Sequence, residues 1–225
     1  MFKEIKKLHK QGYKRIVGID EAGRGPLAGP VVAGAVFYNL SRFNLANFKK
    51  IKDSKKLTAK QREEWYKILT KHSDLEWGVA SVGEKIIDKI NILQATKLAM
   101  AKAVKDLEKK LGKPADFLII DGNFILSYTD PRPRSKDTTR TGIVELPQKA
   151  IPKGDEKIFL CAAASIIAKV TRDRIMVKMH KKYPQYGFEK HKGYGTKEHL
   201  LALRKHRPCV IHRKTFGPVR KITKN

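Results

Sequence analysis

The sequence has few acidic residues, few cysteines and no long apolar run, and each shortage excludes a class of protein. Only 22 Asp and Glu residues stand against 49 Lys and Arg residues, which leaves a formal net charge of +27. Cys161 and Cys209 are too few for the disulfide framework of a small secreted protein, so we expect a cytoplasmic location. The most apolar stretch, residues 161–168, is far shorter than the roughly 20 residues of a membrane span.

The excess of positive charge predicts a polyanionic partner. Nucleic acid is favoured over an acidic membrane surface, because both attract a basic protein but a Lys- and Arg-rich domain is typical of nucleic-acid binding. The basic N-terminus lacks the apolar core of a signal peptide. With 41% hydrophobic residues, the 225-residue chain has enough apolar side chains for a buried core. We therefore expect a folded, soluble protein that does not associate with membranes.

Apolar patterns and turn residues predict one α/β domain. Short apolar runs predict strands at residues 15–20, 30–37, 76–82 and 117–120. Three- and four-residue apolar spacing and capping residues predict helices at residues 58–72, 84–111 with a bend near Asn91, 158–182 and 196–206. A polar, Pro-containing stretch at 127–142 predicts a flexible loop. We expect a basic leader at 1–13 and a domain at 14–225, with a C-terminal extension from about residue 190.

The densest group of chemically active residues lies at 18–30, which reads Gly-Ile-Asp-Glu-Ala-Gly-Arg-Gly-Pro-Leu-Ala-Gly-Pro. Asp20 and Glu21 end an apolar strand, where two buried carboxylates are unfavourable unless a cation neutralises them. Neighbours on a strand point to opposite faces, so both serve one site only if the chain bends, as Gly23, Gly25 and Pro26 permit. The alternative is a solvated acidic turn. The glycine spacing and the strand that follows exclude a dinucleotide-binding loop.

Two further aspartates lie at the ends of predicted elements. Asp121 follows the strand at 117–120, and Asp155 precedes the helix at 158–182. Singly, the first fits an ordinary turn and the second a helix cap. Together with Asp20, they suggest a site that binds Mg²⁺ or Mn²⁺ through oxygen ligands and hydrolyses phosphodiesters. Cys209 and His212 supply only two ligands, so no zinc site is expected.

Seven segments, in order along the chain from about residue 14 to 219, together resemble bacterial ribonuclease HII. The most specific is Asp-Glu-Ala-Gly-Arg-Gly-Pro-Leu-Ala-Gly-Pro-Val-Val-Ala-Gly-Ala-Val at 20–36, and the least specific is Lys-Gly-Asp at 153–155. The other segments are 53–57, 121–123, 163–173, 191–196 and 212–216.

The resemblance implies an RNase H-like fold, with a mixed β-sheet flanked by helices and a basic helical C-terminal extension. It implies a monomeric endonuclease that hydrolyses RNA in RNA/DNA hybrids. It also implies cutting 5′ of ribonucleotides embedded in duplex DNA, with 3′-hydroxyl and 5′-phosphate ends. Two Mn²⁺ or Mg²⁺ ions would be held by four acids: Asp20, Glu21, Asp121 and Asp155. The segment between the last two is longer than the family pattern, which leaves Asp130 or Asp137 as an alternative fourth carboxylate.

The resemblance also implies a set of substrate contacts. Gly23, Arg24 and Gly25 match a ribonucleotide-recognising loop, whose flexible backbone can approach a sugar closely because glycine has no Cβ. Tyr194 matches an aromatic side chain that packs on the neighbouring deoxyribose. Phosphate contacts are expected from Ser54, Lys55, Ser165, Lys169 and Lys192, with Lys56, Arg172, Lys190 and Arg213 as further candidates; the alternative for each lysine is a solvated surface.

Two other functions remain as alternatives to this reading. The charge alone would suit a nucleic-acid-binding protein without catalysis, whose function a chelator would leave unchanged. A related nuclease that acts on DNA would cut an all-DNA duplex as fast as one that carries a ribonucleotide. Contact between the C-terminus and a replication clamp is an open question at the level of sequence.

Overall fold

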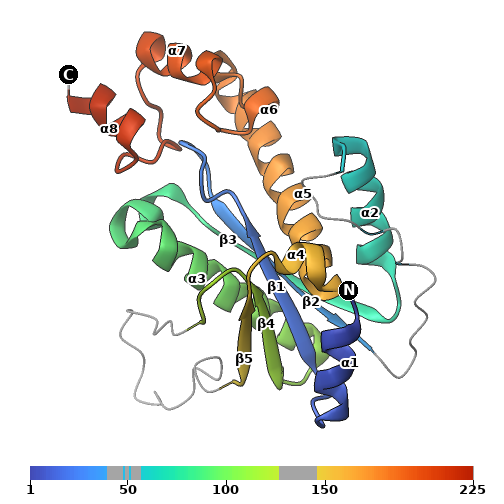
Figure 1. Cartoon of the computed structure of the whole chain (residues 1–225). Coiled ribbons are helices and arrows are strands. Elements are labelled where there is room, and N and C mark those ends of the chain that lie inside the picture. Colours follow the sequence, from blue (N-terminus) through green and yellow to red (C-terminus); the bar gives the residue numbers. More distant parts are fainter. Residues whose placement is uncertain (40–47, 49–50, 52–56, 127–145, 225) are drawn as a thin grey trace.

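A computed structural model describes residues 1–39, 48, 51, 57–126 and 146–224 (Figure 1). Five strands form one mixed sheet in the order β3-β2-β1-β4-β5. Their bounds are β1 Ile16–Ala22, β2 Val31–Tyr38, β3 Leu75–Val82, β4 Phe117–Asp121 and β5 Gln148–Ile151. The first three strands form an antiparallel meander, whereas β4 is parallel to β1 and β5 is parallel to β4.

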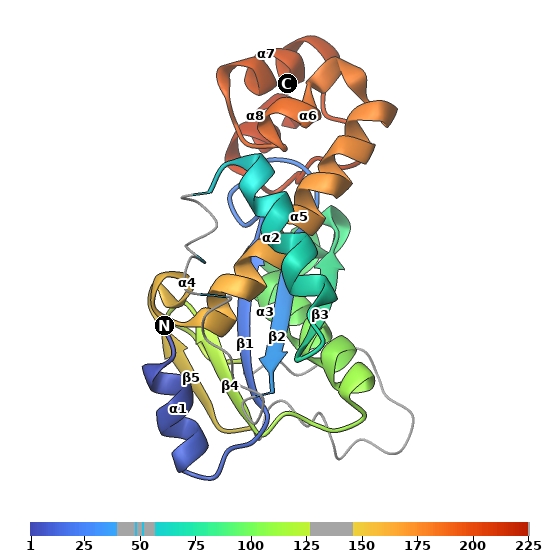
Figure 2. The ribbon, with the colours of Figure 1, turned by 90° about the vertical axis from the view of Figure 1, so that its right-hand side faces the viewer.

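Helices cover both faces of the sheet (Figures 1 and 2). Helix α3 (Glu84–Leu111) packs on one face, and α5 (Phe159–Lys182) packs on the other with α2 (Ala59–Lys71) beside it. The smaller helices are α1 Lys3–Lys10, α4 Gly154–Lys157, the 3₁₀ helix η4 Pro184–Tyr186, α6 Phe188–His191, α7 Lys197–His206 and α8 Gly217–Lys224. Figure 2 shows α6, α7 and α8 gathered beyond one end of the sheet. No helix in the described part of the chain combines the length and apolarity needed to cross a bilayer.

The predicted strands and long helices are present, and several short elements were missed, among them α1, β5 and the one-turn helices α4 and α6. Helix α1 lies in the stretch expected to be a basic leader, and it buries Ile5 and Leu8 against the core. Strand β5 has only four residues, and because it lies at the sheet edge it is nowhere fully buried. Strand β5 is too short to carry a pattern of its own, whereas α1 has Ile5 and Leu8 at helical spacing, a signal that the reading of residues 1–13 as a basic leader overlooked. The loop predicted at 127–142 lies outside the described residues.

Local signals that begin and interrupt the helices are confirmed in atomic detail. At the start of α2, the Thr58 hydroxyl accepts from the Gln61 N–H at 3.2 Å and the Gln61 side chain accepts from the Thr58 N–H at 2.9 Å, which completes a capping box. In α3, Asn91 has φ 64° and its side-chain oxygen accepts from the Leu93 and Gln94 N–H groups. The predicted bend is therefore a break at Asn91 followed by a new cap.

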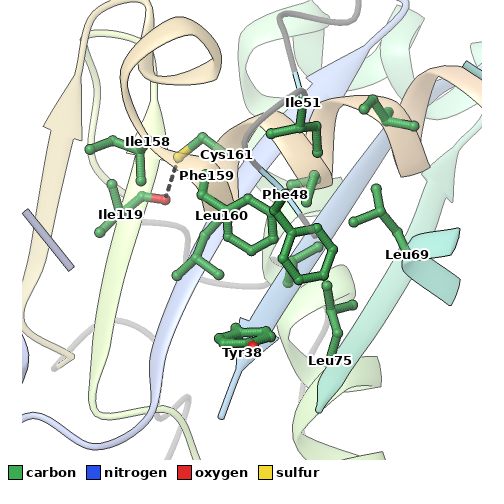
Figure 3. Packing of buried hydrophobic residues seen from close by; sticks show 14 of the residues in the cluster. Tyr38, Phe48, Ile51, Leu69, Leu75, Ile119, Ile158, Phe159, Leu160 and Cys161 are labelled. Atoms are coloured by element: carbon green, nitrogen blue, oxygen red, sulfur yellow. Dashed lines mark hydrogen bonds between the residues drawn. The ribbon is translucent and has the colours of Figure 1, made fainter. Parts of the chain in front are cut away.

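Close packing of α5 on the sheet brings chemically active residues to the end of β1. Phe159 lies against Phe48, with ring centroids 4.8 Å apart, in the cluster of Figure 3. A Cβ added at Gly18 would lie 2.3 Å from the Leu160 Cβ, and one added at Gly34 would lie 2.5 Å from the Ala164 carbonyl oxygen. These glycines allow the helix backbone to approach β1 and β2 directly, which carries the following turns of α5 past the carboxyl end of β1.

Candidate metal centre and substrate pocket

Three aspartates from three elements meet where the parallel strands β1 and β4 end. Asp20 lies in β1, Asp121 is the last residue of β4, and Asp155 lies in the first turn of α4. One carboxylate oxygen from each lies within 4.8 Å of the others. Ile19 pairs with Ile120, so Asp20 and Asp121 leave neighbouring strands at the same edge. The acids that the sequence places at the ends of separate elements are therefore side by side.

The turn before α4 holds Asp155 in this cluster. The Gly154 N–H donates to the Asp121 carboxylate at 2.7 Å, and a Cβ added at Gly154 would lie 3.3 Å from the Asp121 Cα. The N-cap of α5 is Ile158 and that of α4 is Lys153, so Asp155 does not have the alternative role of a helix cap. Its side chain is buried. Asp130 and Asp137 lie outside the described residues.

The electrostatics of the cluster favour a bound cation. Burial raises the pKa of Asp20 well above its ordinary value, and the charges of Glu21 and Asp121 raise it further. Hydrogen bonds from the Ser165 side chain and from the Glu21 N–H, at 2.7 Å, act in the opposite direction. Buried like charges of this kind are stabilised by a proton or a cation. Closely spaced carboxylate oxygens are the donor set that Mg²⁺ and Mn²⁺ prefer, so these residues fit such a metal.

The Glu21 side chain leaves β1 on the opposite face from its neighbour Asp20. Strand pairing runs without interruption through Ala22, so Asp20 and Glu21 leave opposite faces of β1 and the chain turns only after them, at Gly23. Both carboxylates nevertheless line one cavity of about 230 Å³. The Glu21 carboxylate lies 3.4 Å from the Arg24 guanidinium. The bend that the sequence predicts is therefore present, but it lies after Asp20 and Glu21 and not between them.

Residues from distant parts of the chain complete this cavity. They come from α5, from the β1–β2 connection and from the segment after α6, and they include Ser165, Lys169, Gly23, Arg24, Gly25 and Tyr194. The Lys169 ammonium lies 2.5 Å from the Asp173 carboxylate, and burial lowers the pKa of Lys169. The cavity thus combines acids, which suit a metal, with a lysine and backbone groups, which suit a phosphate and a sugar.

Two of the basic residues considered for phosphate contact have a different role. Arg172 and Arg213 are fully buried, and both donate to backbone carbonyls of residues 23–30, which we call the glycine-rich loop. Neither side chain is exposed to a phosphate. The loop is accordingly held from within, where the sequence led us to expect flexibility. The sequence identifies Arg172 and Arg213 as basic, but only their burial shows that they contact backbone carbonyls and not phosphates.

Tyr194 lies beside this loop, and its backbone carbonyl is contacted by a pair of histidines, His199 directly and His212 through His199. Its side chain is 44% exposed, and a Cβ added at Gly25 would lie 3.7 Å from its ring. His199 Nδ1 lies 2.9 Å from the Tyr194 carbonyl oxygen, and His199 Nε2 lies 3.0 Å from His212 Nε2. Burial lowers the pKa of each histidine to about 4, so both are neutral at pH 7. This pair could not be predicted from the sequence, because its two members meet only through the fold.

The remaining predicted contacts do not all reach the cavity. Lys192 has φ 51° and donates from its ammonium to the Glu189 carbonyl; it borders a separate groove of about 480 Å³ between α2 and α5. Ser54, Lys55 and Lys56 lie outside the described residues. The structure therefore places Ser165 and Lys169 at the acidic cavity, and Lys192 at the neighbouring groove instead.

Comparisons with known proteins point to one family. The family model described as Ribonuclease HII matches residues 17–219. A Ribonuclease HII from Chlamydia muridarum is 48% identical over 211 residues, which cover 94% of this chain and 86% of the relative. One from Bacillus velezensis is 47% identical over 210 residues, which cover 93% of this chain and 72% of that relative.

A solved structure supports the fold assignment. The crystal structure of the ribonuclease H2 from Pyrococcus horikoshii OT3 superposes with a TM-score of 0.71 at 29% identity. The superposition covers 93% of this chain and 97% of the archaeal one. The mixed sheet flanked by helices is therefore shared along almost the whole length of both chains.

Proposed function

The chain belongs to the ribonuclease HII family, and from this premise we propose that it cuts 5′ of single ribonucleotides embedded in duplex DNA, leaving 3′-hydroxyl and 5′-phosphate ends. Family membership itself makes the chain an endonuclease that hydrolyses RNA in RNA/DNA hybrids, so a binding protein without catalysis is excluded. The proposal is carried by one observation: three of the acids, Asp20, Glu21 and Asp121, line the same cavity as residues 23–25 of the glycine-rich loop and Tyr194.

The proposed metal ligands are the three clustered aspartates, Asp20, Asp121 and Asp155, together with Glu21, which lines the cavity beside them. Mn²⁺ or Mg²⁺ bound there, which we propose as two ions, supplies Lewis-acid stabilisation of a phosphodiester and lowers the pKa of water. The chain contributes ligands whose positions are set by strand pairing and by the Gly154–Asp121 hydrogen bond. No side-chain nucleophile is needed, and Cys161, buried behind the cluster with a raised pKa, is not one.

Recognition of the ribonucleotide is assigned to the other wall of the cavity. Backbone groups of Gly23, Arg24 and Gly25 can approach a sugar because the two glycines carry no side chain. A 2′-hydroxyl both donates and accepts hydrogen bonds, and it is the group that distinguishes RNA from DNA. The half-exposed ring of Tyr194, next to Gly25, offers a flat apolar surface to a neighbouring deoxyribose. Backbone phosphates are proposed to contact Ser54, Lys55, Ser165, Lys169 and Lys192.

Mapping the cut on a duplex with one ribonucleotide tests the proposed function. We expect a single nick 5′ of the ribonucleotide with Mg²⁺ or Mn²⁺, and none after chelation by EDTA. End-labelling and ligation of the products identify the terminal groups. An all-DNA duplex of the same sequence is the control. A nick on the 3′ side, or equal cutting of the all-DNA duplex, would contradict the proposal and favour a DNA nuclease.

Tyr194→Ala is expected to impair cutting at an isolated ribonucleotide more than cutting of a long hybrid. Apolar burial contributes about 25 cal/mol per Å². Covering about 50 Å² of the ring against a sugar therefore corresponds to a loss in kcat/KM at the isolated ribonucleotide on the order of tenfold. Long hybrids offer many registers and no obligatory deoxyribose at the position of the ring. Tyr194→Phe, which keeps the ring, serves as the matched control. Equal losses on both substrates would make Tyr194 a structural residue.

A further inference from the structure

Arg213 lies in the connection between α7 and α8 and is fully buried under the glycine-rich loop. Its Nη2 donates to the Gly23 carbonyl at 2.6 Å, and its Nη1 donates to the Arg24 carbonyl at 2.9 Å. Its Nε and Nη2 both donate to the Gly29 carbonyl, at 2.9 and 2.8 Å. One guanidinium therefore fixes both arms of the loop at once.

These contacts also set the direction of two N–H groups. In a trans peptide the carbonyl of one residue and the N–H of the next point in opposite directions, and all described peptides are trans. Because the Gly23 and Arg24 carbonyls point inward to Arg213, the N–H groups of Arg24 and Gly25 point away from it. Neither N–H has a hydrogen-bond acceptor among the described residues. Both residues line the acidic cavity.

A second buried arginine keeps the loop from shifting as a whole. Arg172 of α5 donates from Nε to the Pro30 carbonyl at 2.9 Å and from Nη2 to the Ala28 carbonyl at 3.1 Å. In addition, the Leu27 N–H donates to the Gly193 carbonyl, next to Tyr194, and the Arg213 N–H donates to the Leu27 carbonyl. The loop is thereby tied to α5 and to the C-terminal segment, while the Gly23 and Arg24 carbonyls accept from Arg213.

The chemistry of the guanidinium explains why lysine cannot replace Arg213. In the described part of the chain, no carboxylate forms an ion pair with the Arg213 guanidinium, whose donors are directed instead at carbonyl oxygens. The guanidinium is a rigid planar fork with five N–H donors, whereas a lysine ammonium has three donors on one atom and cannot bridge the same carbonyls. Lysine at this position would keep the charge and lose the geometry.

We propose that Arg213 is a positioning residue for ribonucleotide selectivity, because it turns the Arg24 and Gly25 N–H groups into the cavity as paired donors for an oxygen of the ribose. The inference rests on the proposed function. Arg213 acts through the loop and touches no substrate atom. Selectivity for RNA thus depends on a residue near the C-terminus that orients a loop near the N-terminus.

The test compares Arg213→Lys with wild type in binding two duplexes of identical sequence, one with a single ribonucleotide and one all DNA. Binding is measured with Ca²⁺ in place of the reactive metal, and the readout is the ratio of the two Kd values. We expect this ratio to fall about fivefold or more, since one hydrogen bond of about 1 kcal/mol corresponds to that factor. Arg220→Lys, an exposed Arg-to-Lys change on α8, is the matched control.

The ratio separates positioning from a general loss of structure. A smaller folded fraction lowers binding of both duplexes equally and leaves the ratio unchanged. If wild type prefers the ribonucleotide-bearing duplex and Arg213→Lys shows the same ratio of Kd values, Arg213 does not have the proposed role. The proposed function is unaffected by that result. A wild type that binds both duplexes equally overturns this inference alone, whereas a wild type that also cuts both duplexes equally overturns the proposed function with it.

Amide hydrogen exchange of the wild-type chain provides a second measurement if Arg213→Lys does not fold. We expect the ribonucleotide-bearing duplex to slow exchange in peptides covering residues 22–26 more than the all-DNA duplex does. Peptides from α3, which packs on the face of the sheet opposite to α5, serve as the internal reference. Equal protection by the two duplexes would show that these N–H groups do not face the ribose, and would overturn the inference.

Discussion

Asp20→Asn is expected to abolish metal-dependent cleavage, with a loss in kcat of about a thousandfold or more. The change keeps the size of the side chain and its ability to accept from the Glu21 N–H and from Ser165. It removes the negative charge at the centre of the acidic cluster, where a metal contributes several kcal/mol to transition-state stabilisation. Duplex affinity, which is set by the basic surface, should change little. Single-turnover cleavage and fluorescence anisotropy measure the two quantities.

The same substitution should raise the melting temperature in the absence of metal. Burial and the charges of Glu21 and Asp121 make ionised Asp20 unfavourable, so a neutral side chain relieves the repulsion. Glu64→Gln, an exposed acid-to-amide change on α2, is the control and should leave both activity and stability unaltered. Cleavage by Asp20→Asn at the wild-type rate would remove the acidic cluster from the mechanism. Lost activity together with a lower melting temperature would point to misfolding instead.

Gly18→Ala is expected to destabilise the protein by about 3 kcal/mol or more, because the new methyl group has no room. Its Cβ would lie 2.3 Å from the Leu160 Cβ, 2.6 Å from the Leu160 carbonyl carbon and 2.8 Å from the Cys161 nitrogen. Two of these atoms belong to the backbone of α5, so the helix must move away from β1. A loss of this size lowers the melting temperature by roughly 6–12 °C in a protein of this length.

Displacement of α5 should also impair catalysis, since Ser165 and Lys169 lie further along the same helix at the cavity. Gly83→Ala is the matched control, because a Cβ at Gly83 meets no atom within 4 Å. Calorimetry of both variants, with kcat measured well below the lower melting temperature, separates the two effects. A Gly18→Ala protein as stable as wild type would mean that the helix packs less closely than the structure shows.

Much of the secondary structure follows from local signals in the sequence. The capping box at Thr58 and the break at Asn91 depend on side chains within a few residues, so they are visible without tertiary information. Strand β5 and helix α1 are different, because their stability comes from neighbours distant in the chain: β5 pairs with β4, and α1 buries two residues in the core. Strand β5 has no pattern of its own, and the pattern of α1 is limited to Ile5 and Leu8 at helical spacing.

The candidate site divides in a similar way. Asp121 ends β4, and Asp20 lies two residues before the end of β1. Both strands can be recognised in the sequence, and parallel strands place their carboxyl ends at one edge of a sheet, so the approach of the two acids was foreseeable. Asp155 lies in a one-turn helix whose location depends on contact with Asp121. The His199–His212 contact and the burial of the two arginines depend on how the C-terminal segment folds back over the loop.

By itself, the sequence determined the family, the charge that attracts a nucleic acid, and the acids at the ends of apolar strands, because these depend on residue type and local order. Only the tertiary structure decided which charges meet and which are buried. Arg213 is one of many basic residues in the sequence, yet the fold encloses it beneath backbone carbonyls of the glycine-rich loop. The physical reason is that burial removes water, so a charge there must be satisfied by fixed partners, and those partners come from elsewhere in the chain.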